Sequence, residues 1–150
     1  MEVIHYFDSD RQEHWLSEIG KSDWSAGELL GRMLAEGTFY DFVGEGSEVL
    51  LLVDGDTLIS YCTYARQDDI QPTELTPWVG FVYTFPQYRG RRYVGLLLEQ
   101  ADRLARQAHV REIYISTNHI GLYEKYGCTF KMTAKDWEGA WSRIYVRKVE

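Results

Sequence analysis

The chain has 150 residues, the length of one ordinary domain, so we expect a single domain over residues 1–150. Hydrophobic residues make up 45% of the chain and charged residues 26%, which excludes a disordered, collagen-like or low-complexity protein. The formal net charge of −7 argues against nucleic acid or an anionic membrane as the main partner, and it leaves room for a basic substrate.

Short polar breaks divide the first half of the chain into elements, without a linker or an internal repeat. Residues 3–7 predict a short strand, and residues 11–19 predict an amphipathic helix. The residues Ser25 and Glu28 have the spacing of a capping box, which predicts a helix that begins there and ends near Gly37. Two apolar runs on either side of an Asp-Gly-Asp turn predict a β-hairpin over 49–53 and 58–64.

The second half of the chain reads as strand, helix, strand, helix, strand, strand. The predicted strands cover about 78–84, 110–116, 128–133 and 141–149. A strongly amphipathic helix follows the first of them, and a short helix over 119–126 follows the second. Strand–helix–strand units of this spacing imply neighbouring parallel strands joined by a right-handed crossover.

Few cysteines and no targeting signal are visible in the sequence. Cys62 and Cys128 are too few for a disulfide framework, and we expect both to be buried in strands. The first residues show no basic region followed by an apolar run, so no signal peptide is predicted. The apolar runs fall far short of the ~20 residues that cross a bilayer. Together these patterns predict a cytoplasmic protein that uses no metal and no membrane partner.

The most informative segment joins the strand over 78–84 to the helix that follows it. It contains Arg89, Gly90, Arg91 and Arg92, so its local charge is opposite to that of the whole chain. The first amides of a helix have no acceptor within the helix, and the helix dipole is positive there, so this end can bind phosphate or pyrophosphate. The alternative is that the arginines only cover the helix surface and pair with acids. The usual glycine motifs for nucleoside triphosphates and dinucleotides are absent.

Two motifs in this half resemble signatures of the GNAT N-acetyltransferase superfamily. Residues 86–90, Pro-Gln-Tyr-Arg-Gly, lead into a leucine-rich helix and resemble the acetyl-CoA loop of that family. Residues 118–127 resemble its second signature, an Asn followed by Leu-Tyr-Glu-Lys-x-Gly. The order of strands and helices matches the family from the first strand to the last, so the resemblance covers the whole chain.

The resemblance implies an α/β (α+β) fold of the GNAT-like acyl-CoA N-acyltransferase type. Its mixed, mostly antiparallel sheet has a central splayed pair of parallel strands and is flanked by helices. Acetyl-CoA would be the co-substrate, with its pyrophosphate at the amides of residues 90–95 and its pantetheine arm along the preceding strand. Carried over from the family, the binding residues would be Val82, Tyr83, Thr84, Arg89, Gly90, Arg91, Arg92, Tyr93, Val94, Gly95 and Asn118.

The loop departs from the family pattern, which is usually Arg/Gln-x-x-Gly-x-Gly/Ala. Here Arg92 and Val94 stand at the two small positions, and Gly95 comes one residue late. We expect helical backbone at Arg92, so that its amide can still meet the cofactor while its side chain adds charge near a phosphate. For Asn118, the alternative to a cofactor contact is a cap on the short helix that follows it.

Acetyl transfer to an amine needs a base, a site for the oxyanion and an acid for the departing thiolate. Tyr123 stands where the family usually has its general acid, and a phenol suits protonation of a thiolate. The resemblance assigns the oxyanion to a backbone N–H on the splayed strand, near Val82. Glu74, just before that strand, is the first candidate for the base, and Asp68 and Asp69 are alternatives.

The acceptor is the part that the sequence leaves open. The resemblance implies direct transfer in a ternary complex to a primary amine on a small molecule or a peptide. The donor could carry an acetyl or a longer acyl group. Trp78 and Trp137 are candidates to line the acceptor pocket. A non-catalytic acyl-CoA-binding or sensor module, a protein-interaction module and a homodimer are further alternatives.

Overall fold

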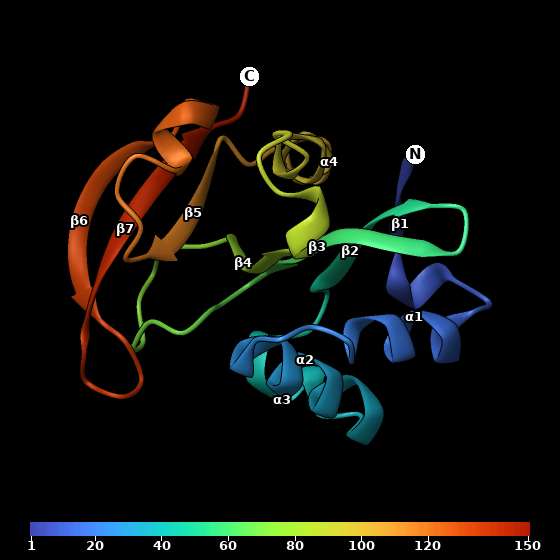
Figure 1. Cartoon of the computed structure of the whole chain (residues 1–150). Helices are drawn as coiled ribbons and strands as arrows, with labels where there is room; N and C mark the ends of the chain where they lie inside the picture. The colour runs from blue at the N-terminus through green and yellow to red at the C-terminus, as the bar shows by residue number, and fades with distance from the viewer.

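A mixed seven-stranded sheet forms the centre of the computed structural model, which describes all residues from 1 to 150 (Figure 1). The strand order is β1-β2-β3-β4-β5-β7-β6, and only the β4–β5 pair is parallel. This confirms the predicted mixed sheet with one central parallel pair. The strands are β1 (Glu2–His5), β2 (Glu48–Asp54), β3 (Thr57–Ala65), β4 (Trp78–Thr84), β5 (Glu112–Thr117), β6 (Thr129–Lys135) and β7 (Trp141–Lys148).

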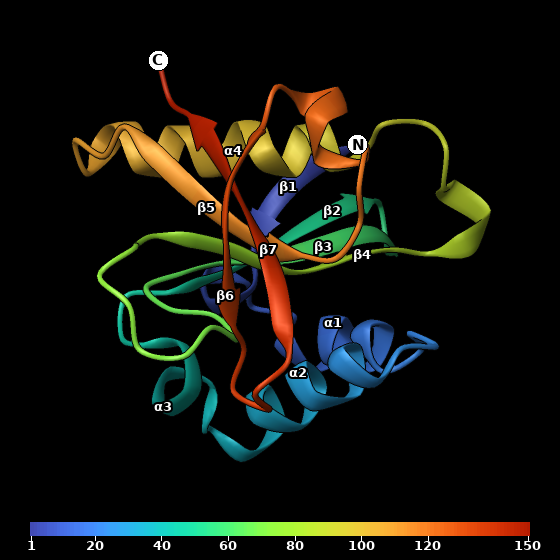
Figure 2. The same ribbon diagram turned by 90° about the vertical axis from the view of Figure 1, so that its left-hand side faces the viewer.

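Helices cover both faces of the sheet (Figures 1 and 2). On one face lie α1 (Gln12–Ile19), α2 (Ser25–Glu36) and α3 (Phe39–Val43), and on the other lies α4 (Val94–Gln107). Short 3₁₀ helices are η1 (Tyr6–Asp8), η2 (Pro86–Tyr88) and η3 (Tyr123–Tyr126). None of the helices combines the length and apolar character that crossing a bilayer would require.

The two covered faces explain why β2 is an unbroken apolar run. Val49, Leu51 and Val53 belong to the core cluster beneath α1–α3, whereas Leu50 and Leu52 belong to the cluster beneath α4. Successive side chains of a strand point to opposite faces, so a strand that is covered on both faces has no polar face to show. All five of these side chains are buried.

The parallel strands β4 and β5 pair only at their beginning and then separate. Their single register pair is Trp78 with Tyr114, and the Tyr114 amide donates to the Pro77 carbonyl at 3.0 Å. Trp78 is fully buried at this closed end, where its indole N–H donates to the Leu75 carbonyl at 2.7 Å. The predicted splay is therefore present, and it opens a gap at the carboxyl ends of the two strands.

A β-bulge in β4 changes which way its side chains point. Tyr61 pairs with Tyr83 and Thr63 with Gly80, so β4 has one residue more than β3 between these pairs. Phe81 lies in this bulge with a positive φ of 49°. For a bulky residue, such a backbone costs on the order of 1–2 kcal/mol, and it is found where the surroundings hold it in place.

Two features of the first half differ from the sequence predictions. The capping box does not form, because Ser25 is the first helical residue and the N-cap is Trp24, whose side chain makes no capping bond. The helix α3 was not predicted, because five residues are too few to show helical periodicity. The end of α2 matches the prediction, since Gly37 caps it in the left-handed conformation.

Candidate active site

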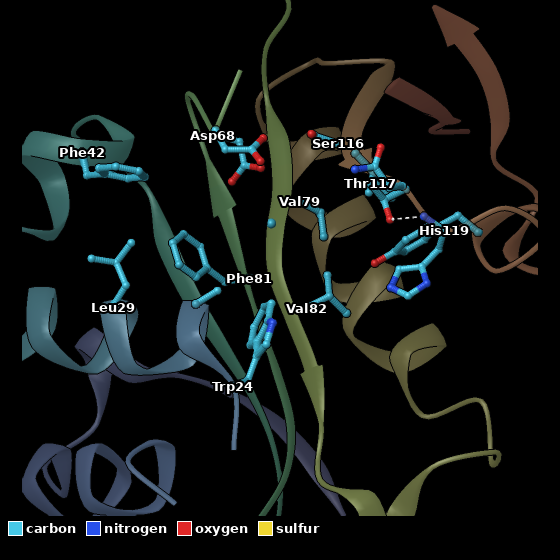
Figure 3. Close-up of a pocket in the computed structure, with 16 residues that line it drawn as sticks. Trp24, Leu29, Phe42, Asp68, Val79, Phe81, Val82, Ser116, Thr117 and His119 are labelled. Atoms are coloured by element: carbon cyan, nitrogen blue, oxygen red, sulfur yellow. Dashed lines mark hydrogen bonds between the residues drawn. The ribbon is translucent and has the colours of Figure 1, made fainter. Parts of the chain in front are cut away.

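Two cavities adjoin at the opening between β4 and β5, and Figure 3 shows the residues that line the larger one. The larger, of about 580 Å³, faces α2 and α3, and the second, of about 500 Å³, lies against the start of α4. They share four lining residues: Trp24, Val82, His119 and Tyr123. A ligand that fills one cavity can therefore present a reactive group to a ligand in the other.

The second cavity is bounded by a row of free backbone amides. Nothing in the protein accepts a hydrogen bond from the amides of residues 90–94. The Gly95 amide is different, because it donates to the Arg92 carbonyl at 3.1 Å, and the Leu96 amide donates to Tyr93 at 3.0 Å. Of the predicted amides 90–95, the free ones thus end at Val94, the first residue of α4. Free amides at a positive helix end form a site that favours anions.

Arg92 does not have the helical backbone that the sequence reasoning expected. Its φ is 59°, in the left-handed region, which explains why a glycine is usual at this position of the pattern. Its guanidinium donates to the Lys125 carbonyl at 2.7 Å and lies 5.6 Å from the centre of the Tyr126 ring. The side chain therefore ties the amide row to η3 and compensates for the strained backbone.

The other predicted cofactor residues divide between the two cavities. Those that line the second cavity are Val82, Tyr83, Thr84, Arg89, Gly90, Arg92, Tyr93 and Val94. Arg89 lies over the Tyr83 ring at 5.4 Å, and its Nε donates to the Thr84 carbonyl at 2.9 Å. Arg91 is exposed and lines neither cavity, and Gly95 lies against the Tyr126 ring instead.

Asn118 and His119 follow β5 at the mouth of the opening, and both are exposed. Asn118 lines the larger cavity and forms no hydrogen bond with its side chain. It does not cap η3, whose N-cap residue is Leu122, so the alternative capping role is not observed. The His119 amide donates to the Thr117 hydroxyl at 3.1 Å (Figure 3).

Tyr123 lies where the two cavities meet. Its side chain is buried with 5% exposure, and burial raises the pKa of its phenol well above the ordinary value. The phenol therefore keeps its proton at any physiological pH and has a proton to donate.

The segment that carries Tyr123 is held by α4 and β7. Arg147 of β7 donates to the Tyr126 carbonyl at 2.7 Å and forms two bonds to Asp102 of α4, at 2.9 and 2.8 Å. Such a bidentate pair is directional, and it fixes the planes of both groups. The position of the phenol is therefore set by packing and by ion pairing at some distance from it.

Two adjacent carboxylic acids lie at the inner end of the larger cavity. Asp68 is 7% exposed, and burial, followed by the neighbouring Asp69 carboxylate, raises its pKa to about 8. Burial also raises the pKa of Asp69, whereas a hydrogen bond with Ser116 lowers it. No Lys or Arg lines this cavity, so neither acid is paired with a lysine or arginine there.

Gly80 allows Asp68 to reach this position. A Cβ atom built on Gly80 would lie 2.1 Å from Oδ1 of Asp68, so any larger residue would displace the carboxylate. The acid thus lies directly against the backbone of the bulged strand β4. Glu74, the first candidate for the base, is exposed in the preceding loop and lines neither cavity.

Sequence reasoning did not identify the apolar wall of the larger cavity. This wall consists of Trp24, Ala26, Leu29, Phe42 and Phe81, which come from three elements and the turn before α2. No short motif links them, so only the fold could bring them together. Of the two predicted tryptophans, Trp78 is fully buried away from the cavity, and Trp137 lies behind the wall, 5.0 Å from the Phe42 ring.

Comparisons with known proteins agree with this architecture. The model of the acetyltransferase (GNAT) family matches residues 9–128. Among solved structures, the aminoglycoside 6'-N-acetyltransferase from Enterococcus faecium is 12% identical, with a TM-score of 0.69 over 100% of this chain and 98% of that one. An aminoglycoside 6'-N-acetyltransferase complexed with coenzyme A is 11% identical, with a TM-score of 0.66 and the same coverage.

A third similar structure is an acetyltransferase of the GNAT family from Staphylococcus aureus Mu50. It is 14% identical, with a TM-score of 0.65 over 99% of each chain. No curated protein matches the sequence significantly. At these identities the solved structures establish the fold alone, whereas the family model covers most of the sequence. The splayed strands, the free amides at the start of α4 and this match together show that the chain belongs to the GNAT family of acetyltransferases.

Proposed function

We propose that this protein transfers an acetyl group from acetyl-CoA to a primary amine, directly, within a ternary complex. One observation carries the proposal: the cavity with free amides and the cavity with buried acids meet at Tyr123. An anionic co-substrate suits the second cavity, which has the free amides, and an ammonium suits the larger cavity, which has the acids. The names of the similar structures, which include aminoglycoside acetyltransferases and a coenzyme A complex, support a small-molecule acceptor and this co-substrate.

The co-substrate would bind along the second cavity. Its pyrophosphate would accept from the amides of residues 90–94, with Arg89 adding positive charge beside them. Its pantetheine arm would follow β4 at Val82, Tyr83 and Thr84, and Asn118 would contact it from the end of β5. The thioester would then lie at the junction of the cavities, near Tyr123. This arrangement gives no role to Arg91 and Gly95, and their contact with the cofactor stays a prediction.

The acids of the larger cavity would prepare the acceptor. An ammonium beside Asp68 and Asp69 lowers the raised pKa of Asp68, because an opposite charge favours the carboxylate. The ionised acid then takes a proton from the ammonium, and the amine that results attacks the thioester carbonyl carbon. We assign the base to this pair and not to Glu74, which lies in the exposed loop outside the cavity.

The remaining steps fall to the strand and to Tyr123. A backbone N–H near Val82 would donate to the oxygen that becomes negative when the new N–C bond forms. As the C–S bond breaks, Tyr123 would give its proton to the thiolate, and the proton lost by the nitrogen replaces it through water. The products are the acetylamide and free CoA, so no covalent intermediate on the enzyme is needed.

Calorimetric titration with acetyl-CoA, desulfo-CoA and adenosine 3',5'-bisphosphate tests the proposal. We expect micromolar binding that Arg89→Ala weakens, followed by release of CoA thiol when amines are added. Tyr123→Phe should keep the binding and lose the thiol release. Binding without turnover for every amine would favour a non-catalytic acyl-CoA-binding or sensor module. No binding at millimolar ligand would contradict the proposal and favour an interaction module.

A further inference from the structure

The larger cavity has two chemically different sides (Figure 3). Apart from Tyr123 at the junction with the second cavity and the indole of Trp24, the polar side chains lie at its inner end and at the end of β5, where Asp68, Asp69 and residues 116–119 lie. The opposite side is the apolar wall formed by Trp24, Ala26, Leu29, Phe42 and Phe81. Apart from the indole N–H of Trp24, no side chain of this wall can donate or accept a hydrogen bond.

Contacts behind the apolar wall hold it in place. Trp24 stacks on Tyr83, with ring centres 5.6 Å apart and planes 14° apart. The Phe42 ring lies edge-on to Phe81 at 6.4 Å and packs on Trp137 behind it at 5.0 Å. The bulge of β4 directs Phe81 into this group. A wall that is ordered before the ligand arrives loses little freedom on binding, so it can contribute to affinity.

The charges of the cavity restrict the ligand further. Asp68 and Asp69 suit an ammonium group, and the lining contains neither Lys nor Arg. A ligand carboxylate would therefore meet two acids and no lysine or arginine. A polyhydroxylated ligand would place hydroxyl groups against the wall, where they lose water and find no partner, and such unpaired polar groups are strongly rejected.

We propose that the acceptor is a small primary amine attached to an aromatic or other flat apolar group, without a carboxylate. This rests on the proposed acetyltransferase function and names its substrate class. The ammonium lies against Asp68 and Asp69, and the ring lies on Trp24, Phe42 and Phe81. The volume of about 580 Å³ falls within the range that small-molecule sites occupy.

A panel of four amines tests separately how the ring, a carboxylate and hydroxyl groups on the acceptor affect its reaction. We would measure CoA thiol release with 2-phenylethylamine, ethylamine, L-phenylalanine and D-glucosamine. We expect kcat/KM for 2-phenylethylamine to exceed each of the others by at least tenfold. Ethylamine lacks the ring, L-phenylalanine adds a carboxylate, and D-glucosamine replaces the apolar group with hydroxyls. A lysine-containing peptide is added to test a macromolecular acceptor.

Phe42→Ala tests whether the wall is responsible for the preference. The ratio of kcat/KM for 2-phenylethylamine to that for ethylamine should fall at least tenfold in this variant, mainly through KM. This ratio does not depend on the fraction of the sample that is folded. The matched control is Trp141→Ala, which removes an exposed aromatic side chain that lines neither cavity and should leave the ratio unchanged.

The outcomes distinguish the two proposals. If D-glucosamine, L-phenylalanine or the peptide equals 2-phenylethylamine, or if Phe42→Ala leaves the ratio unchanged, the acceptor class is wrong while the acetyltransferase stands. If acetyl-CoA binds in calorimetry and no amine of the panel releases thiol, the acceptor class is overturned and cofactor binding is retained. If acetyl-CoA does not bind, the proposed function fails and the acceptor class fails with it.

Discussion

The two cavities of the site are built in different ways. The one at the start of α4 is bordered by free backbone amides of the consecutive residues 90–94. The one facing α2 and α3 is made of side chains from the first-half helices, the loop before β4, β4 itself and the end of β5. A site of consecutive amides tolerates side-chain changes, which explains how Arg92 can replace a glycine there. A site of distant side chains depends on each of them.

Gly80→Ala should have the largest effect on catalysis, because it displaces the proposed base Asp68. It changes the larger cavity and leaves the second cavity intact. The added methyl group would overlap Oδ1 of Asp68, and the carboxylate must move away from β4. We expect kcat to fall at least a hundredfold, while the Kd for acetyl-CoA changes less than threefold. Steady-state kinetics and calorimetry measure the two quantities. Gly31→Ala is the control, because its nearest neighbour would lie 4.0 Å away. A parallel loss of acetyl-CoA binding would show that the cavities are not independent.

Tyr123→Phe should affect the junction of the cavities nearly as strongly. Phenylalanine keeps the packing and removes the proton donor, so we expect kcat to fall by about a hundredfold, in line with loss of general acid catalysis. The Tyr123 hydroxyl forms no hydrogen bond within the protein, so the urea midpoint should barely change. Tyr64→Phe, which lines neither cavity, is the control. Unchanged kcat would assign proton donation to another group.

The pH dependence of activity should reflect the acid pair. The pKa of Asp68 is about 8, so kcat/KM, which reports the free enzyme, should rise with pH through that value. Asp69→Asn removes the neighbouring like charge, the largest cause of the shift after burial, and should move this inflection to lower pH. Burial still keeps it above the ordinary aspartate value. A profile without an inflection between pH 6 and 9 in either protein would exclude Asp68 as the base.

The same raised pKa should make stability depend on pH. An acid whose pKa is higher in the folded protein binds its proton more tightly there, so its contribution to stability is complete below the unfolded pKa of about 4. That contribution is lost as pH rises through the folded value of about 8. Urea unfolding at pH 5, 7 and 8.5 should show a decline in the wild type that Asp68→Asn reduces. An equal decline in both proteins would point to other groups.

Substitutions of Arg92 should have the smallest effect, and they test the second cavity, at the start of α4. Both variants lack the side-chain bond to Lys125. Glycine adopts the left-handed backbone at this position without strain, whereas alanine keeps the strain. Arg92→Ala should therefore be about 1 kcal/mol less stable than Arg92→Gly, as urea unfolding would measure. Both variants keep the amide row, so binding of adenosine 3',5'-bisphosphate should differ less than fivefold between them. Equal stabilities would mean that the loop relaxes when the side chain is lost.

Much of the fold and the loop at the start of α4 could be predicted from the sequence, because their signals are local. The apolar run of β2, the amphipathic pattern of α4 and the turn at 86–90 each lie within a few consecutive residues. The mixed sheet and the splay of its parallel pair were implied by the resemblance of the motifs and of the order of elements to the GNAT family. Local patterns failed where neighbours decide the conformation: Ser25 lies inside the helix that it was expected to cap, and Arg92 is left-handed.

The larger cavity was decided only by the tertiary structure. In the sequence, Asp68 and Glu74 are both acids of the same loop, and nothing local separates them. Folding buries Asp68 against Gly80 and leaves Glu74 in solvent, and burial in turn raises the pKa of the first. Trp24, Phe42 and Phe81 become one surface because packing brings together elements that are far apart in the chain. The sequence by itself therefore determined the family and pointed to the loop whose free amides precede α4, whereas long-range packing determined the chemistry of the larger cavity.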